Sequence, residues 1–367
     1  MKITTIEIYK MPVPLKEPFV ISLGPQNSAD NIVIKINTDE SIIGFGECSP
    51  YMSINGESMD TCFIVAQYLA KVLKNKNPLE IEHCINTMNK TIYGNNSIKS
   101  AFDMALYDIA SQHANIPLYQ LLGGSLNKII YTDMTVGLGS IEKMAADALQ
   151  FKNEGFTAIK VKLGTNIKDD VERIKAIREA IGFEIPLRID ANQGWNVETA
   201  IEILNALNSF KIEHCEEPIP RWDFMNLLKV KNESPIKIMA DESCCDQHDA
   251  KRLLDLNACD YLNIKLGKSG GIFNALEIVQ LAKQKNMHLQ IGSFMESRLA
   301  TTAFAHFAFC SDLIVHFDLD TPLMFASDPV IGGIVYKEKG VIELPKPNGI
   351  GATIEQEYLE KLENVIC

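Results

Sequence analysis

The sequence predicts an α/β fold: a (β/α)8-type (TIM) barrel joined to a smaller α+β capping domain. Three observations carry this prediction. Short apolar runs recur every 20 to 30 residues from about Lys128 onward, and segments with helical spacing separate them. The first run is not followed by GxGxxG, the main sequence sign of a dinucleotide-binding sheet. A chain of 367 residues suits a barrel of about 250 residues plus roughly a hundred more.

Eight apolar runs are expected to be the barrel strands, and they begin at Lys128, Ala158, Pro186, Ile212, Ile236, Tyr261, His288 and Leu313. The helix-like stretches between them include Ile141–Glu154, Ile167–Ile181, Val197–Phe210 and Ile272–Lys285. Eight βα units in a row favour a closed parallel barrel over a doubly wound sheet. The LGKSGG stretch, Leu266–Gly271, offers backbone amides to a phosphate, but an ordinary βα loop is favoured there.

Residues 1–127 are expected to form the cap and residues 128–324 the barrel, with the tail 325–367 returning to the cap. The predicted cap elements are two strand-like segments followed by two helical ones: Ile3–Met11, Asn31–Asn37, Met59–Leu73 and Ile98–His113. In the tail, Ile331–Leu344 alternates like a β-hairpin with Lys339 and Gly340 at its turn.

Composition excludes several classes of partner. The net charge of −12 and the lack of a basic run argue against nucleic acid, and no apolar run reaches the ~18 residues that span a membrane. The nine cysteines include no CxxC pair, which is typical of reduced thiols in a cytoplasmic protein. A homo-oligomer that binds a small molecule is expected.

Charged residues stand at the carboxyl ends of nearly all the predicted strands. They are Lys160 and Lys162 on the second strand, then Asp190, Glu216, Asp241, Lys265, Glu296, Asp318 and Asp320 on or just after the third to eighth strands. Barrel strands are buried on both faces. The desolvation of this many charged groups would therefore be costly without a common ligand. Active sites of such barrels lie at this end.

Three of these acids, Asp190, Glu216 and Asp241, come from consecutive strands and can converge on one cation. Their oxygens are the ligands that Mg²⁺ prefers, and three carboxylates leave the ion open to water and substrate. One Mg²⁺ per subunit is therefore predicted.

Lys162 and Lys265 belong to the second and sixth strands, which face each other in a ring of eight. Two bases on opposite sides of one carbon suit racemisation or epimerisation, in which one base removes a proton and the other returns one. A carbon next to a carboxylate is a weak acid, and the metal with Lys160 would stabilise the charge that develops.

The KVK, DAN, EEP, ADES and NIKLGKSGG segments, in this order and spacing, resemble the muconate-lactonizing branch of the enolase superfamily along essentially the whole chain. The resemblance implies a capping domain plus barrel, Mg²⁺ on Asp190, Glu216 and Asp241, and Lys162 with Lys265 as the acid/base pair. This branch of the superfamily includes lactonizing enzymes, o-succinylbenzoate synthases, N-acylamino acid racemases and dipeptide epimerases.

The DLD sequence at Asp318–Asp320 is similar to the dipeptide epimerase motif, in which both carboxylates hold the substrate's free ammonium group. The same resemblance places Thr135 against the dipeptide backbone and Ser293 and Glu296 on the carboxylate side. One departure concerns Gly24, where relatives that act on L-Ala-D/L-Glu carry an arginine.

The predicted activity is therefore epimerisation of L-Ala-X dipeptides with small or uncharged X, such as L-Ala-D/L-Ala. L-Ala-D/L-Glu remains a further candidate, with Lys16 or Arg298 in place of the arginine. The alternatives are an N-acylamino acid racemase or o-succinylbenzoate synthase, and a non-catalytic metal-binding scaffold barrel.

Overall fold

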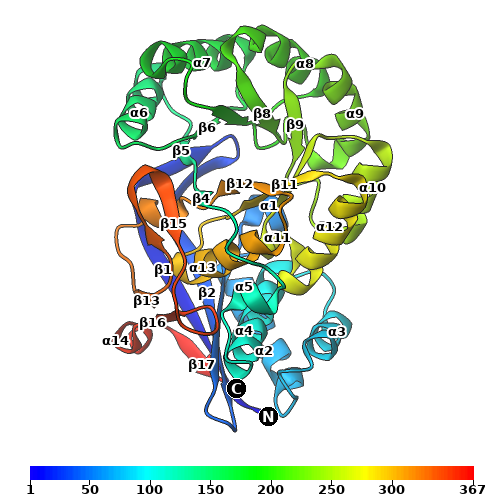
Figure 1. The fold of residues 1–367 in the computed structure, drawn as a ribbon, viewed down its shortest axis with the longest axis vertical. Helices are drawn as coiled ribbons and strands as arrows, with labels where there is room; N and C mark the ends of the chain where they lie inside the picture. Colours follow the sequence, from blue (N-terminus) through cyan, green and yellow to red (C-terminus); the bar gives the residue numbers. More distant parts are fainter.

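Eight parallel strands form the upper half of the molecule in the computed structural model, which describes residues 1–367 (Figure 1). Each strand pairs with its neighbour in the chain, in the order β12-β11-β10-β9-β8-β7-β6-β5. The ends of this sheet also meet, because the backbone N–H of Asp133 donates to the carbonyl of Phe317 at 3.2 Å. The predicted barrel is confirmed. Its strands are β5 (Met134–Val136), β6 (Ile159–Lys162), β7 (Leu187–Asp190), β8 (Ile212–Glu216), β9 (Lys237–Ala240), β10 (Tyr261–Ile264), β11 (His288–Gly292) and β12 (Ile314–Asp318).

Helices surround the barrel and follow its strands in turn. They are α6 (Ile141–Asn153), α7 (Ile167–Ile181), α8 (Val197–Ala206), α9 (Phe224–Glu233), α10 (Gln247–Leu256), α11 (Leu266–Ser269), α12 (Ile272–Lys285) and α13 (Arg298–Phe307), with short 3-10 turns η1 (Asn208–Phe210), η2 (Arg221–Asp223) and η3 (Ala308–Cys310). The side chain of Asn166 caps α7, and Gly182 ends it at φ +76°. The stretch Val197–Phe210 is divided between α8 and η1. No helix of the protein has the length and apolar character needed to cross a membrane.

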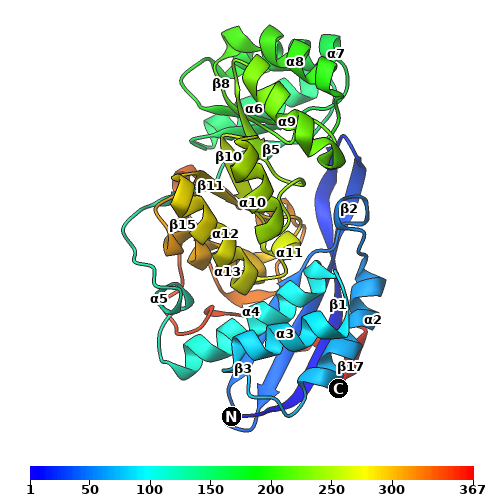
Figure 2. The ribbon, with the colours of Figure 1, turned by 90° about the vertical axis from the view of Figure 1, so that its right-hand side faces the viewer.

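The cap is an antiparallel sheet of order β17-β1-β2-β3 covered by helices. Its elements are β1 (Ile3–Ile21), β2 (Gly24–Thr38), β3 (Ile43–Cys48), α1 (Met52–Asn55), α2 (Met59–Leu73), α3 (Ile81–Thr91), α4 (Asn96–His113), α5 (Leu118–Leu121) and β17 (Asn364–Ile366). Helix α4 is almost entirely buried, because it packs on β3 and also on α11 and α12 of the barrel (Figure 2). Glycines at Gly44 and Gly46 allow this approach, since a Cβ atom at either position would collide with the backbone of α4.

The β1–β2 hairpin extends from the cap to the mouth of the barrel (Figures 1 and 2). Two contacts attach its tip: the N–H of Leu138 donates to the carbonyl of Val20 at 2.8 Å, and Ser22 Oγ donates to the carbonyl of Asn192 at 2.9 Å. A small buried apolar cluster lies under the tip and joins the two parts, and it consists of Ile21, Tyr51, Ile54 and Phe294, with Phe19 packed against it.

The C-terminal tail differs in part from the expected hairpin. Only β14 (Val335–Tyr336) and β15 (Val341–Glu343) form it, around the 3-10 turn η5 (Glu338–Gly340), and β15 also pairs with β4 (Ile130–Tyr131). The prediction that the hairpin begins at Ile331 is wrong, because Gly332 and Gly333 take positive φ angles of 71° and 74° and interrupt the run.

The other tail elements are η4 (Thr321–Met324), β13 (Val330–Gly332), β16 (Ala352–Ile354) and α14 (Gln356–Leu359), and β13 pairs with β16. The last strand, β17, pairs with β1 of the cap sheet. The division of the chain at residues 127 and 324 stays a prediction.

Candidate active site

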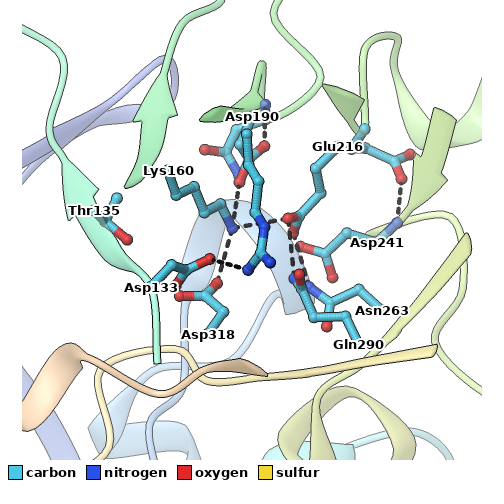
Figure 3. Close-up of polar contacts among 12 residues, drawn as sticks. Asp133, Thr135, Lys160, Asp190, Glu216, Asp241, Asn263, Gln290 and Asp318 are labelled. Carbon is cyan, nitrogen blue, oxygen red and sulfur yellow. Dashed lines mark hydrogen bonds and ion pairs between the residues drawn. The ribbon is translucent and has the colours of Figure 1, made fainter. Parts of the chain in front are cut away.

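Three fully buried carboxylates meet at the carboxyl ends of adjacent barrel strands (Figure 3). Asp190 and Glu216 are paired residues at the ends of β7 and β8, and Asp241 directly follows β9. Asp241 Oδ2 is buried and lies 2.8 Å from the ammonium group of Lys265, while Glu242 Oε2 and Asn192 Oδ1, nearby in the sequence, are buried without a hydrogen-bond partner. Three buried carboxylates that converge at one place form the oxygen-rich donor set that a hard cation such as Mg²⁺ prefers.

Like charges shape the titration of this group. Burial, followed by the charges of Asp190 and Asp241, raises the pKa of Glu216 to about 7. Burial alone would also raise the pKa of Asp190, but the ammonium groups of Lys162 and Lys160 lower it to about 2. The acids repel one another and are held ionised only where a cation lies against them.

The two candidate base lysines come from strands four positions apart in the sheet, Lys162 at the end of β6 and Lys265 just after β10. Lys162 Nζ lies 2.6 Å from Asp190 Oδ2, and Lys265 Nζ lies 2.8 Å from Asp241 Oδ2. The ring centroid of Phe294 is 4.8 Å from Lys265 Nζ. Each lysine is thus held by a different acid, and both side chains are buried.

Lys160 lies between the acids and the eighth strand. Its Nζ is 2.8 Å from Glu216 Oε2, 2.8 Å from Asp318 Oδ2 and 3.1 Å from Asp190 Oδ2 (Figure 3). Burial would lower the pKa of Lys160, but the carboxylates of Asp318, Glu216 and Asp190 together raise it. The ammonium group therefore stays charged and links the two halves of the site.

Asp318 and Asp320 lie beside a third carboxylate that the sequence analysis did not select. Oxygen atoms of Asp133, Asp318 and Asp320 all lie within 4.8 Å of one another, and the three side chains are buried. Asp320 Oδ2 accepts the backbone N–H of Thr135 at 2.7 Å, whereas Asp320 Oδ1 and Asp133 Oδ1 have no hydrogen-bond partner. Such a group of acceptors fits a cation with several N–H donors.

The remaining predicted residues lie around this centre. Ser293 Oγ donates to the backbone carbonyl of Asp318 at 3.1 Å. Glu296 turns back to its own loop, where its Oε2 accepts the N–H of Phe294 at 2.6 Å. Burial, and then the charge of Glu47, raises the pKa of Glu296 to about 8. Thr135 holds Asp320 through its backbone, as described above.

Several buried residues that support the site were missed. Asn263 Nδ2 donates to Glu216 Oε1 at 2.8 Å, and Gln290 Nε2 is 3.2 Å from Glu216 Oε2. Lys268 donates to Asp241 Oδ1 and, at 3.2 and 3.1 Å, to the carbonyls of Cys244 and Asn263. Asn263 could have been found from the sequence. It precedes Lys265 by two residues, and side chains two apart on a strand point to the same face.

The LGKSGG stretch is not a phosphate loop. It forms the single turn α11, and Asp103 of the cap accepts the N–H of Ile272 at the start of α12 at 2.5 Å. Within the stretch itself, the N–H groups of Lys268 and Ser269 donate to the carbonyl of Lys265 and that of Gly271 donates to the carbonyl of Leu266, so these amides are not available to a phosphate.

The two cations considered in place of an arginine at residue 24 are bound to other groups. Arg298 pairs with Asp328 and donates to the carbonyls of Gly332 and Val330, so its guanidinium group is engaged on the C-terminal tail. Lys16 Nζ donates to the carbonyl of Leu323 at 2.8 Å in an exposed position. Gly24 itself has φ +120° and open space around it.

Comparison with known proteins agrees with this geometry. The model for the N-terminal domain of mandelate racemase and muconate lactonizing enzyme matches residues 3–123, and the enolase C-terminal domain-like model matches residues 143–358. A D-Ala-D/L-Ala epimerase from Cytophaga hutchinsonii is 55% identical over 100% of this chain and 99% of its own. A crystal structure of the dipeptide epimerase from that organism, complexed with Mg and D-Ala-L-Val, covers both chains fully with a TM-score of 0.99.

Two further relatives are more distant. A hydrophobic dipeptide epimerase from Enterococcus faecalis is 38% identical over 96% of this chain and 99% of its own. An N-succinyl-L-Arg/Lys racemase from Bacillus cereus is 35% identical over 99% of this chain and 98% of its own. With both domains matched and the acids, lysines and cap in place, the chain belongs to the mandelate racemase/muconate lactonizing enzyme family of the enolase superfamily.

Proposed function

We propose that this chain is a Mg²⁺-dependent dipeptide epimerase that inverts the α-carbon of the second residue of alanyl dipeptides. One observation carries the proposal: two buried lysines on opposed strands flank a group of acids, and a cluster of three carboxylates lies beside them. The lysines suit proton transfer on two faces of one carbon, and the carboxylate cluster suits a free N-terminus.

Asp190, Glu216 and Asp241 would hold the metal. A bound Mg²⁺ would neutralise these acids and stabilise the negative charge that develops on the substrate's carboxylate group when the α-proton leaves. When no metal is bound, burial would lower the pKa of Lys265, but the carboxylates of Asp241 and Glu216 have the larger effect and raise it.

Lys162 and Lys265 would exchange the proton. One lysine takes the α-proton from its face of the carbon, and the other, as an ammonium, returns a proton to the opposite face. For the other epimer the roles are reversed, so each lysine acts as base for one configuration. Lys160 would add a positive charge at the carboxylate side from its position between Glu216 and Asp318.

Asp318 and Asp320 would select a free N-terminal ammonium. A buried carboxylate needs a cation or donors to offset its desolvation, and an N-acyl group offers neither the charge nor the donors. This supports a dipeptide over the N-acylated substrates of the racemase alternative.

The second side chain would lie near the apolar cluster under the β1–β2 hairpin, where Gly24 supplies no arginine and the nearby Arg221 donates to the backbone carbonyl of Ile54. Small or uncharged side chains suit this surrounding. The sequence analysis expected L-Ala as the first residue, whereas the 55% identical relative is named for D-Ala. Alanine in either configuration is therefore part of the proposal and of its test.

The test is proton NMR in D₂O with the four Ala-Ala stereoisomers and with N-succinylated amino acids. We expect loss of the α-proton signal of the second residue and conversion between its epimers, with no turnover of the N-succinyl compounds. Exchange in the N-succinyl compounds alone would identify an N-acylamino acid racemase, and no exchange in any compound would identify a non-catalytic barrel.

We further propose that the protein is a cytoplasmic homo-oligomer that binds no nucleic acid and no membrane. The nine free cysteines support the cytoplasmic compartment, and the net charge of −12 supports the expectation that nucleic acid and anionic membranes are not bound. The native molecular mass tests the oligomeric state, and cell fractionation tests the compartment.

A further inference from the structure

Asp133 is a buried carboxylate with no role in the proposed reaction. It lies just before β5 with 0% of its surface exposed, and its Oδ2 is 2.9 Å from Arg188 Nη1. Its Oδ1 has no hydrogen-bond partner, and one oxygen of Asp133 lies within 4.8 Å of oxygens of Asp318 and Asp320; Figure 3 shows Asp133 beside Asp318. A carboxylate oxygen left without a donor in a protein interior indicates a missing partner.

We propose that Asp133 is the third carboxylate of the ammonium subsite, and that the three carboxylates share one proton which the dipeptide's ammonium group displaces on binding. This inference rests on the proposed function and names a residue and a charge exchange that the predicted pair Asp318 and Asp320 does not include.

The fixed position of Arg188 leaves Asp133 Oδ1 free for a ligand. The guanidinium group is held by three partners: Nη1 by Asp133, Nε by Glu213 Oε2 at 2.7 Å, and Nη2 by His316 Nδ1 at 2.9 Å. It therefore reaches only one oxygen of Asp133. A primary ammonium has three N–H donors, which matches the three carboxylates of the cluster.

The charges around the cluster do not balance when it is empty. The charged groups that face Asp133 are Asp318, Asp320, Arg188 and Lys160. Arg188 is shared with Glu213, and Lys160 is shared with Glu216 and Asp190. Three buried carboxylates at this separation cannot all remain ionised without a further cation, so a proton takes its place.

The titration of the three groups agrees with this arrangement. Burial, and then the charge of Asp318, raises the pKa of Asp133 well above its usual range and that of Asp320 to about 7. For Asp318 the effect of burial is overcome by Lys160, Lys162 and Lys265, which lower its pKa. Asp318 is therefore ionised in the empty cluster, and the shared proton lies between Asp133 and Asp320.

The experiment is isothermal titration calorimetry of the Mg²⁺-loaded enzyme at pH 6.5 in two buffers with different enthalpies of protonation. The titrant is an alanyl dipeptide that the enzyme epimerises, brought to epimer equilibrium beforehand, so that no net reaction contributes heat. We expect release of up to one proton in wild type. Asp133→Asn should lose this release and bind about tenfold or more weakly, because a charge-assisted hydrogen bond to the ammonium group becomes a bond to a neutral amide oxygen.

Glu213→Gln is the matched control, since it removes the other carboxylate partner of Arg188 on the side away from the cluster. It should keep the proton release and the affinity of wild type. Because the base lysines can also exchange protons on binding, the difference between wild type and Asp133→Asn is the decisive quantity.

A wild-type enzyme that epimerises the dipeptide but binds it without buffer dependence would overturn this inference alone. The same holds if Asp133→Asn releases as many protons as wild type. If Asp133→Asn does not fold, the wild-type measurement still decides. A wild type that exchanges no dipeptide α-proton overturns the proposed function as well.

Discussion

Asp241 accepts a hydrogen bond from the ammonium group of Lys268 on Oδ1, and Lys265 lies against the other oxygen of the same carboxylate. Lys268 is fully buried, and all its other acceptors are backbone carbonyls. Burial would lower the pKa of Lys268, but the charge of Asp241 raises it. Asp241 is thus the only carboxylate that compensates the buried ammonium group of Lys268. Loss of the Asp241 carboxylate should therefore affect the stability of the fold as well as metal binding.

Asp241→Asn should therefore lose Mg²⁺ binding and also destabilise the metal-free protein. Removal of one partner from a buried ion pair costs about 3–5 kcal/mol. Calorimetry with Mg²⁺ and urea unfolding in EDTA measure the two effects. Asp255→Asn is the control, because Asp255 pairs with Lys251 on an exposed helix face and should change neither property. Wild-type stability of Asp241→Asn would contradict the second effect, and full wild-type turnover in EDTA would contradict the role of the metal.

The two lysines should be separable by isotope exchange. Lys162→Ala and Lys265→Ala should each abolish epimerisation, because each lysine serves one face of the carbon. Each variant should retain exchange of the α-proton for at most one epimer, and the two variants should differ in which epimer it is. Proton NMR in D₂O with each pure epimer measures this. Interconversion at the wild-type rate in both variants would exclude the two-base mechanism.

The barrel could be predicted from the apolar runs that recur every 20 to 30 residues, because each of the eight runs contains one strand of the barrel sheet. The first run differs in detail: it predicts one strand, but its first part forms β4, which pairs with β15, and β5 begins only at Met134. Asp133 lies in the gap between them, so its inward direction could not be deduced from strand alternation.

The charged residues at strand ends were found in the sequence because burial makes them costly. The residues that support them were missed for two reasons. Lys268 lies in a stretch that the sequence predicts as an ordinary βα loop, and Arg188 lies within a strand, where its sequence position gives no sign of a site. The partners of both, Asp241 for Lys268 and Asp133 for Arg188, are set by tertiary contacts between segments far apart in the chain. Sequence spacing does not give such contacts.

A free N-terminus should be obligatory for turnover. N-acetylated alanyl dipeptides should be poorer substrates than free ones by a factor of several hundred or more, since loss of one partner of a buried charge pair costs about 3–5 kcal/mol. The measurement is kcat/KM for both forms of one dipeptide. Asp320→Asn should lower kcat/KM for the free form and narrow the difference. Equal turnover of both forms would favour the N-acylamino acid racemase alternative.

Asp103 should make stability depend on pH. Burial raises its pKa from 3.8 to about 8, although it accepts the N–H groups of Ile272 and Phe273. Between these values the folded protein keeps a proton that the unfolded chain gives up. Its contribution is therefore complete below about pH 4 and lost as the pH rises through about 8.

Asp103→Asn keeps an acceptor for Ile272 but does not titrate. Its free energy of unfolding should fall less than that of wild type between pH 5 and pH 8. Asp39→Asn, at an exposed aspartate, serves as the control and should keep the wild-type slope. Equal slopes for wild type and Asp103→Asn would show that Asp103 is ionised in the folded protein.

Side-chain selectivity should favour alanyl dipeptides with a small or uncharged second residue over Ala-Glu. A buried γ-carboxylate without a cation costs several kcal/mol, whereas a methyl group needs only a fitting surface. The measurement is kcat/KM across an Ala-X series with the first alanine in both configurations. If glutamate is favoured tenfold or more in wild type, the inference from Gly24 is wrong and the cation lies elsewhere.

A variant that adds a cation must leave the backbone conformation of the turn between β1 and β2 unchanged. Gly24 has φ +120°, a conformation that side chains other than glycine rarely adopt, so Gly24→Arg should strain the turn and lower turnover of all substrates. Gln26, two residues along β2, lies beside Tyr51 of the apolar cluster. Gln26→Arg should therefore raise kcat/KM for Ala-Glu relative to Ala-Ala by about tenfold, as a charge-assisted pair to the γ-carboxylate would. Asn27→Arg places the same charge at the next, exposed position and should leave the ratio unchanged. An equal shift in both variants would mean that the long-range field of the added charge, and not a contact with the γ-carboxylate, sets the preference.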